Sequence, residues 1–281
     1  MPTRLISFAG STLAIEFQGD QPAKIIDFLY GDIPPGQSSQ AQVTFRLLPG
    51  DEPDRLRLFC NEALLPTSGV AAEVAEVLLG NSCYHLAGRS RGGLLFHAAG
   101  LAWQSHGLLL PGTMGAGKST LTAWLLGRGF DYLTDELVFI PQESSLMQTF
   151  PRPLNLKRPS RAVLPKQLDF TQQISQVLST TAADLVPPSV FNPQNRLSEP
   201  PLSLIIFPRY QTNAEFALQT LSKAQTGLEL MQCLVNARNL PEHGFPEITR
   251  LSKMIPAYKL SYSSFEQIGD RIEGILHSLD Q

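Results

Sequence analysis

A run of residues near the middle of the chain combines glycines, one lysine and hydroxyl side chains at a spacing suited to binding phosphate. From Gly112 to Ser119 the sequence fits the pattern G-x-x-x-x-G-K-[ST] at every fixed position. Glycines let successive backbone N–H groups converge on phosphate oxygens that side chains would otherwise block. The sequence therefore predicts a nucleotide-binding phosphate loop formed by Gly112, Thr113, Met114, Gly115, Ala116, Gly117, Lys118, Ser119 and Thr120.

Two side chains at the end of this run suit a bound nucleoside triphosphate. The Lys118 ammonium is expected to reach the β- and γ-phosphates, and the Ser119 hydroxyl to ligate Mg²⁺. The apolar run Leu108–Leu110 predicts the strand that enters such a loop, and Thr120–Leu126 predicts the helix that leaves it. The positive end of that helix would point at the same phosphates. ATP and Mg²⁺ are the cofactors that this motif implies.

Two adjacent carboxylates, Asp135 and Glu136, follow in an apolar segment that predicts a strand over Leu133–Ile140. Neighbouring side chains on a strand face opposite sides, so one of the two would point into the core unless a cation meets it. Mg²⁺ bound to a nucleotide is a natural partner. Alone, such a pair is more often the end of a strand, and that alternative stays open. Its place one helix after Lys118 favours a neighbouring strand that returns to the phosphate loop.

His97 lies in a segment that predicts a strand over Leu94–Gln104. A lone histidine on a strand is usually a satisfied core residue. However, this strand and the one over Gly107–Leu110 predict a hairpin, which places His97 near the phosphate loop and beside Asp135.

Two arginines are weaker candidates for contacts with a phosphate. Arg152 lies between two prolines, and Arg209 follows an apolar run and a proline. A guanidinium offers a fork of donors that suits phosphate oxygens. For each of them a solvated loop arginine remains the alternative.

Taken together, His97, the phosphate loop and the Asp135–Glu136 pair resemble the catalytic domain of HPr kinase/phosphorylase. That family has a histidine before the phosphate-loop strand and an Asp-Asp pair on the next strand. The resemblance covers roughly residues 90–141, and Glu136 departs from it by replacing the second aspartate. It implies an α/β fold with a mixed sheet around the phosphate loop, as in the nucleotide domains of phosphoenolpyruvate carboxykinase.

Segments 150–157 and 206–210 are similar to those of HPr-kinase-related kinases of the "kinase A" type, which are often associated with small peptide-chaperone proteins. The HPr kinase signature E-I-R-G-L-G does not occur in the chain. The resemblance therefore implies kinase chemistry on a different protein or peptide rather than the bifunctional activity on HPr.

The function expected from this resemblance is ATP-dependent transfer of a γ-phosphate to a Ser or similar hydroxyl of a protein or peptide. Asp135 is the candidate general base, His97 would orient it, and Lys118 would hold the phosphates. Ser119 and Glu136 would hold Mg²⁺, with Asp135 as a further candidate ligand. The alternative is a P-loop NTP-binding or NTPase module without a phosphoacceptor. A scaffold that has lost catalysis is a third class.

Composition excludes several classes of protein. Of the 281 residues, 43% are hydrophobic and 17% charged, which suits a folded chain with a core. A net charge of −3 argues against coating of nucleic acid, and three cysteines argue against a disulfide framework. No apolar run approaches the ~20 residues of a membrane span, and the N-terminus lacks the features of a signal peptide. We therefore expect a cytoplasmic protein without nucleic-acid or membrane partners, while a homo-oligomer stays open.

The pattern of apolar residues predicts a β-rich N-terminal region over 1–85 and a phosphate-loop domain over 86–281. Further strands are expected over 13–17, 43–47, 56–60, Leu202–Phe207 and Ala257–Tyr262. Further helices are expected over Val70–Leu79 with Gly80 at its end, Gly227–Ala237 and Ser264–Leu279. Five prolines over Asp184–Pro201 predict a long irregular segment.

Overall fold

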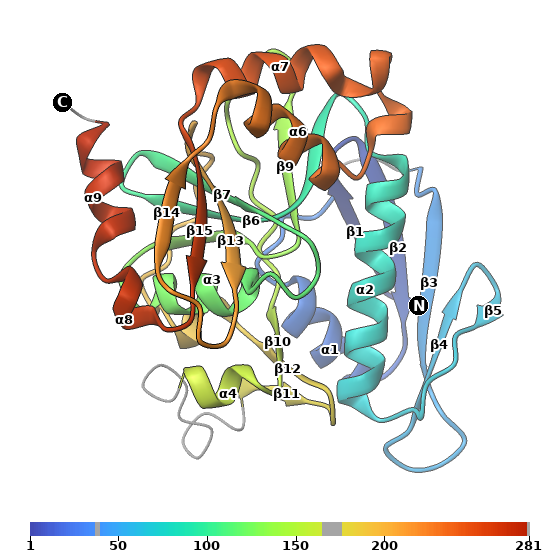
Figure 1. Cartoon of the computed structure of the whole chain (residues 1–281). Helices are drawn as coiled ribbons and strands as arrows, with labels where there is room; N and C mark the ends of the chain where they lie inside the picture. Colours follow the sequence, from blue (N-terminus) through green and yellow to red (C-terminus); the bar gives the residue numbers. More distant parts are fainter. Residues whose placement is uncertain (37–39, 165–175, 280–281) are drawn as a thin grey trace.

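The computed structural model describes residues 1–36, 40–164 and 176–279, which form three β-sheets with helices between and around them (Figure 1). The mixed α/β class expected from the sequence is confirmed. The N-terminal sheet has the spatial order β1 (Thr3–Phe8), β2 (Ser11–Phe17), β3 (Val43–Pro49), β4 (Leu56–Cys60) and β5 (Ala63–Leu64).

The strands predicted over 13–17, 43–47 and 56–60 are confirmed as β2, β3 and β4. Strands β2 and β3 pair in parallel, and helix α1 (Asp20–Tyr30), which the sequence analysis did not predict, makes the crossover between them. Its Ile25, Ile26 and Leu29 are buried at helical spacing against this sheet.

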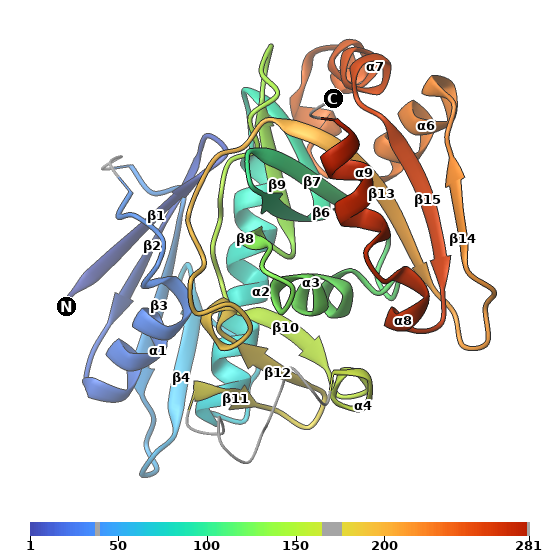
Figure 2. The same cartoon turned by 90° about the vertical axis from the view of Figure 1, so that its left-hand side faces the viewer.

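Helix α2 (Ala71–Arg89) lies between the N-terminal sheet and the rest of the chain, as both views show (Figures 1 and 2). The prediction that Gly80 ends this helix was wrong, because α2 continues for more than two turns beyond it. Burial of Leu78, Cys83 and Leu86 against the N-terminal core outweighs the low helix propensity of one glycine. The division of the chain at residue 85 stays a prediction, and α2 runs across that position.

The largest sheet has seven strands and carries the predicted hairpin at its centre. Its order is β14 (Ala217–Thr220), β15 (Ala257–Tyr262), β13 (Leu202–Tyr210), β7 (His106–Pro111), β6 (Gly93–Trp103) and β8 (Asp131–Thr134), with β9 (Leu137–Pro141) also paired to β6. Strand β13 pairs in parallel with β7 and β15, and all other neighbours are antiparallel. The strands expected over Leu202–Phe207 and Ala257–Tyr262 are thus confirmed.

The two faces of this sheet bury different helices, and side chains alternate between the faces along each strand. Ala99 and Leu101 of β6 pack in one cluster with helix α3 (Lys118–Leu126). Phe96 and Ala98 pack in another, with α6 (Lys223–Cys233) and α7 (Phe245–Met254). His97 therefore belongs to the α3 face by its position in the alternation.

Asn236 ties the segment after α6 to the start of β6. Its side-chain oxygen accepts from the Leu95 N–H at 3.0 Å, and its amide group donates to Gly93 O and Ser90 Oγ, each at 3.0 Å. Helix α6 ends at Cys233 rather than at the predicted Ala237, and the short turns η3 (Ala237–Asn239) and η4 (Pro241–Gly244) follow.

The third sheet contains β10 (Leu154–Lys157), β12 (Ala183–Val186) and β11 (Leu178–Ser179) and lies beneath α3 (Figure 2). Helix α4 (Ser160–Val163) and turn η2 (Pro188–Val190) flank this sheet. The irregular segment predicted from Asp184 therefore starts too early, because Asp184 is fully buried within β12.

The predicted C-terminal helix is two helices, α8 (Phe265–Ile268) and α9 (Arg271–Ser278), separated at Gly269. Gly269 has φ +50°, which interrupts the helical backbone. In the part of the chain that the structure describes, no helix is both long enough and apolar enough to cross a membrane.

Candidate functional site

The glycine-rich segment connects strand β7 to helix α3, as the sequence predicted. Gly115 and Gly117 have φ values of +85° and +93°, a region that only glycine adopts without strain. A Cβ at Gly117 would lie 3.0 Å from both Tyr210 Cβ and Tyr262 Oη, so the position is also crowded. The Tyr210 N–H donates to Ala116 O at 3.1 Å, which joins the loop to the end of β13.

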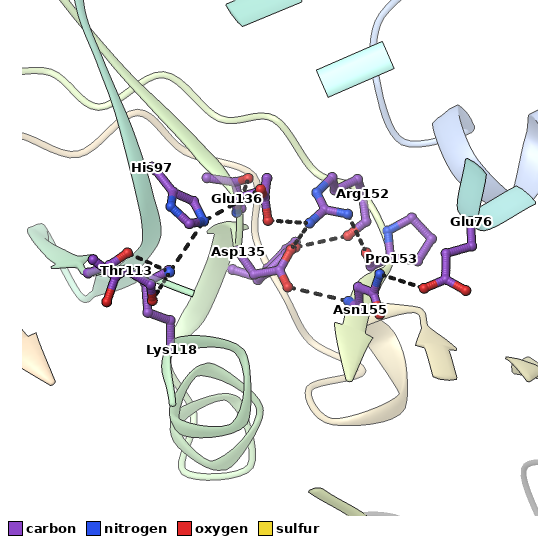
Figure 3. A network of polar contacts seen from close by, with 12 residues as sticks. Glu76, His97, Thr113, Lys118, Asp135, Glu136, Arg152, Pro153 and Asn155 are labelled. Carbon is purple, nitrogen blue, oxygen red and sulfur yellow. Dashed lines mark hydrogen bonds and ion pairs between the residues drawn. The ribbon is translucent and has the colours of Figure 1, made fainter. Parts of the chain in front are cut away.

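Lys118 begins α3, and its ammonium group folds back over the loop. Its Nζ donates to Gly112 O at 2.7 Å and to Thr113 O at 3.2 Å, and lies 3.3 Å from His97 Nε2 (Figure 3). The residue is only 6% exposed, and burial lowers the pKa of its ammonium. The carboxylate of Glu136 opposes this shift, so a charged lysine is held beside a carboxylate.

His97 lies between Lys118 and Glu136. Its Nε2 is 3.3 Å from Lys118 Nζ and 3.5 Å from Glu136 Oε1. Burial, and then the charge of Lys118, lower the pKa of His97, so a neutral ring can accept a hydrogen bond from that lysine. The expected contact of His97 with Asp135 was wrong: its carboxylate neighbour is Glu136.

The two adjacent carboxylates occupy a break between β8 and β9, so the strand predicted over 133–140 is confirmed at both its ends but is not continuous, and the pair follows the end of β8. Strand β6 pairs with both pieces, and the Ala98 N–H donates to Glu136 O at 3.1 Å across the break. Asp135 and Glu136 have different surroundings, because the first is 1% exposed and the second 40%.

Asp135 has all its near partners inside the protein. It accepts hydrogen bonds from Tyr132 Oη at 3.1 Å and the Asn155 N–H at 3.3 Å, and it forms an ion pair with Arg152 at 2.8 Å. Burial, the largest single cause, would lower the pKa of Arg152, but the negative charges around it, Asp135 foremost, together outweigh burial and raise this pKa above its ordinary value. Arg152 also lies 3.4 Å from Glu136 Oε2, so one guanidinium touches both carboxylates (Figure 3).

The oxygen donors near the loop fit Mg²⁺ only in part. Mg²⁺ in nucleotide sites takes one or two protein oxygens together with phosphate oxygens and water. The Ser119 hydroxyl and the half-exposed Glu136 carboxylate suit this, whereas the oxygens of Asp135 already have partners. Among the described residues, no group of three or more His, Cys, Asp or Glu could hold a metal without such further ligands.

The remaining sequence candidates differ in how closely they join this cluster. Arg152 belongs to it, although its partners could not be deduced from its sequence. Arg209 is exposed next to Tyr210, and within the described residues it makes no ion pair. Thr120 Oγ1 lies 2.9 Å from Ser160 Oγ, which links α3 to α4, and Met114 is 80% exposed.

The sequence analysis missed several residues that complete the cluster. Tyr132 and Asn155 bind Asp135, and Asn155 Nδ2 also donates to Glu76 Oε1 at 3.3 Å, which joins the cluster to α2. Asn155 lies in the segment 150–157 noted above, but nothing in the sequence marked it, Tyr132 or Glu76 as part of the cluster. Their only sequence signal is that a carboxylate in an apolar segment requires polar partners.

Comparisons with known proteins give little beyond this geometry. No protein-family model matches the chain, and no curated protein matches it. Among solved structures, the HPr(Ser) kinase/phosphatase from Coxiella burnetii is similar over 66% of this chain and 95% of its own, with 16% sequence identity and a TM-score of 0.32. This similarity is too low to support a function, which has to be argued from the residues of the site itself.

Proposed function

We propose that this chain is an ATP-dependent kinase that transfers the γ-phosphate to a Ser or similar hydroxyl of a protein or peptide. The observation that carries the proposal is the row formed by Lys118, His97 and Glu136 at the start of α3. A complete phosphate-loop sequence lies at one end of this row, and a half-exposed carboxylate lies at the other. A phosphate-holding group and a proton acceptor at the two ends of one row support phosphoryl transfer to a hydroxyl.

Nucleotide binding is assigned to the loop and to Lys118. The loop amides and the N-terminus of α3 offer donors and a partial positive charge to phosphate oxygens. Lys118 now donates to two carbonyls of its own loop, so it has to exchange them for phosphate oxygens when a nucleotide binds. Mg²⁺, when bound, would neutralise charge on the transferring phosphate, and Ser119, together with phosphate oxygens and water, would hold it.

Glu136, rather than Asp135, is the better candidate for accepting the proton of the acceptor hydroxyl. Glu136 is 40% exposed, whereas Asp135 is 1% exposed and held by Arg152. In the proposed step the hydroxyl oxygen forms a bond to the γ-phosphorus as the bond to the β–γ bridging oxygen breaks. The hydroxyl proton passes to the Glu136 carboxylate, and ADP leaves.

His97 is assigned a positioning role. Its neutral ring accepts from Lys118 in this structure, and its Nε2 lies 3.5 Å from the Glu136 carboxylate. It therefore lies between the group that holds phosphate and the group that takes the proton. NTP hydrolysis without an acceptor is the second candidate, because the exposed side of Glu136 is also open to water.

The test compares Lys118→Met with Lys253→Met, a matched change on the exposed part of α7. Lys118→Met keeps the buried aliphatic stem but removes the charge. We expect it to weaken ATP binding at least tenfold, or about 1.4 kcal/mol, while Lys253→Met binds ATP normally. Calorimetry measures ATP binding. Labelled γ-phosphate attached to a protein or peptide indicates a kinase, and its release as inorganic phosphate indicates an NTPase. Unchanged ATP turnover by Lys118→Met would contradict the assignment.

A further inference from the structure

A groove of about 940 Å³ opens beside Glu136 and runs along α2. One wall is the part of α2 from Glu76 to Arg89, and the floor includes Glu136 and Arg152. The groove is also lined by Val235, Arg238 and Asn239. We call this the α2 groove. Its volume is in the range of sites that enclose a small ligand or a few residues of a peptide.

Side-chain hydrogen bonds fix both ends of the α2 groove. At one end Glu76 accepts from Asn155 Nδ2 at 3.3 Å and from Thr180 Oγ1 at 3.1 Å. At the other end Asn239 Nδ2 donates to Gly88 O at 3.1 Å and to Ser90 O at 3.2 Å. These hydrogen bonds fix α2 against the neighbouring segments without any bound molecule, which lowers the cost of ordering the groove on binding.

Two glycines, one toward each end, leave gaps in the side-chain cover of the α2 wall. A Cβ built at Gly80 would meet nothing within 4 Å, and the same holds at Gly88. Each of these glycines costs roughly 1 kcal/mol of helix stability relative to alanine. Tyr84, one turn after Gly80, is 72% exposed and also lines the groove. The missing side chains leave room for a ligand backbone to approach α2 closely.

The far end of the groove is positively charged. Arg89 and Arg238 both line it and are exposed, and within the described residues neither forms an ion pair with a carboxylate. His85 beside Arg89 adds no charge, because burial and then Arg89 lower its pKa. These two guanidinium groups favour a ligand that carries carboxylates.

A second observation, independent of this charge, points to a ligand near Glu136. Arg152 lines the groove and is 4% exposed, and its Nε has no hydrogen-bond partner among the described residues. A buried N–H that lacks a partner is costly, and this Nε has almost no accessible surface, so an acceptor oxygen of a groove ligand reaches it only after the Arg152 side chain shifts.

We propose that the α2 groove binds the phosphoacceptor as a short extended acidic peptide. The backbone of this peptide passes over Gly80, its hydroxyl residue lies at Glu136, and its carboxylates lie toward Arg89 and Arg238. The identity of the occupant as phosphoacceptor rests on the proposed function, whereas the binding of an acidic peptide does not. Specificity is thereby assigned to α2, which lies outside the phosphate-loop segment.

The experiment measures binding of a short fluorescent peptide, with a central serine flanked by glutamates, to the full chain without nucleotide. Gly80→Gln adds a side chain to the α2 wall, and Gly274→Gln in α9 is its matched control, since a Cβ there also meets nothing within 4 Å. Both changes raise helix propensity, so neither should lower the melting temperature. We expect Gly80→Gln to weaken peptide binding at least tenfold, while Gly274→Gln binds like the unchanged protein.

A second set of variants tests the charge. Arg89→Gln combined with Arg238→Gln should weaken binding of the glutamate peptide at least tenfold and reduce its salt dependence. A peptide in which lysines replace the glutamates should bind at least tenfold more weakly to the unchanged protein. Equal binding of the two peptides would overturn the acidic specificity.

The remaining outcomes are equally decisive. No binding of the glutamate peptide, or equal loss in Gly80→Gln and Gly274→Gln, would overturn the proposal. Sedimentation that reveals self-association abolished by Gly80→Gln would assign the groove to a second copy and also overturn it. ATP binding is measured on the same samples. Peptide binding without ATP binding would support the groove proposal and contradict the proposed kinase function. ATP turnover without peptide binding would support nucleotide use and contradict the groove proposal.

Discussion

Arg152 and Asp135 form an ion pair, 2.8 Å long, in which the side chains are 3% and 1% exposed. The pair is buried at the break between β8 and β9, whereas Glu136 is 40% exposed beside the α2 groove. Burial thus separates two adjacent carboxylates into one that holds the fold and one that is available for chemistry.

Removing either member of this ion pair should destabilise the protein strongly. Asp135→Leu and Arg152→Met each leave a buried charge without its partner, which costs about 3–5 kcal/mol. The double variant removes both charges and should recover most of that loss. Chemical denaturation of the four proteins gives the coupling energy directly. Losses that simply add would show that the pair does not act as a unit.

Glu136→Gln should slow phosphoryl transfer while leaving the stability of the protein nearly unchanged. Its side chain is half-exposed and its ion pairs are long, so stability should change by less than about 1 kcal/mol. Loss of the proton acceptor should slow phosphoryl transfer roughly 10²–10⁴-fold. Single-turnover transfer and a thermal melt on the same sample measure both effects. A normal transfer rate would return the general base to Asp135.

Two loop glycines offer a matched pair of substitutions. Gly115→Ala and Gly117→Ala both place a side chain at positive φ, which costs roughly 1–2 kcal/mol. Only at Gly117 does the new Cβ also meet Tyr210 and Tyr262, at 3.0 Å. Gly117→Ala should therefore lose about 1–3 kcal/mol more than Gly115→Ala. Equal losses in denaturation would show that these tyrosines move aside freely.

The thiol of Cys83 should be unreactive in the folded protein. Burial raises its pKa to about 12, so its thiolate fraction at pH 8 is far below that of a free cysteine near 8.5. Iodoacetamide labelling followed by mass spectrometry should modify Cys83 only after unfolding. Because the folded state holds this proton longer, stability should fall as pH rises above about 8.5. Cys83→Ala should flatten that fall, and rapid labelling of the native protein at pH 8 would contradict the prediction.

The elements that the sequence predicts well depend on neighbouring residues alone. The hairpin that holds His97, the loop from Gly112 and the start of α3 each follow from a local pattern of apolar residues and glycines. Their contacts are also local, since β6 and β7 are joined by a tight turn. This explains why half of the candidate site could be placed before the fold was known.

The other half depends on packing between distant segments. The sequence indicated that one of the two carboxylates points into the core and left a strand end open, but nothing around Asp135 indicates that Arg152 and Asn155 are its partners. Gly80 suggests a helix end by local preference, but packing of α2 on the N-terminal sheet carries the helix past it. Lys118 was expected to reach bound phosphates, and in this structure its ammonium is buried between the loop and His97.

The contacts of Asn236 have a consequence for how the chain acquires its fold during synthesis. Leu95 and Asn236 are 141 residues apart in sequence. At 5–20 residues per second, a ribosome needs roughly seven to thirty seconds to make the stretch between them. For that time the start of β6 lacks the Asn236 side-chain amide, which in the folded protein binds the Leu95 N–H and Gly93 O. The nascent chain therefore exposes an incomplete sheet edge, which makes this stretch a natural target for chaperones and a point where cold-slowed translation should promote aggregation.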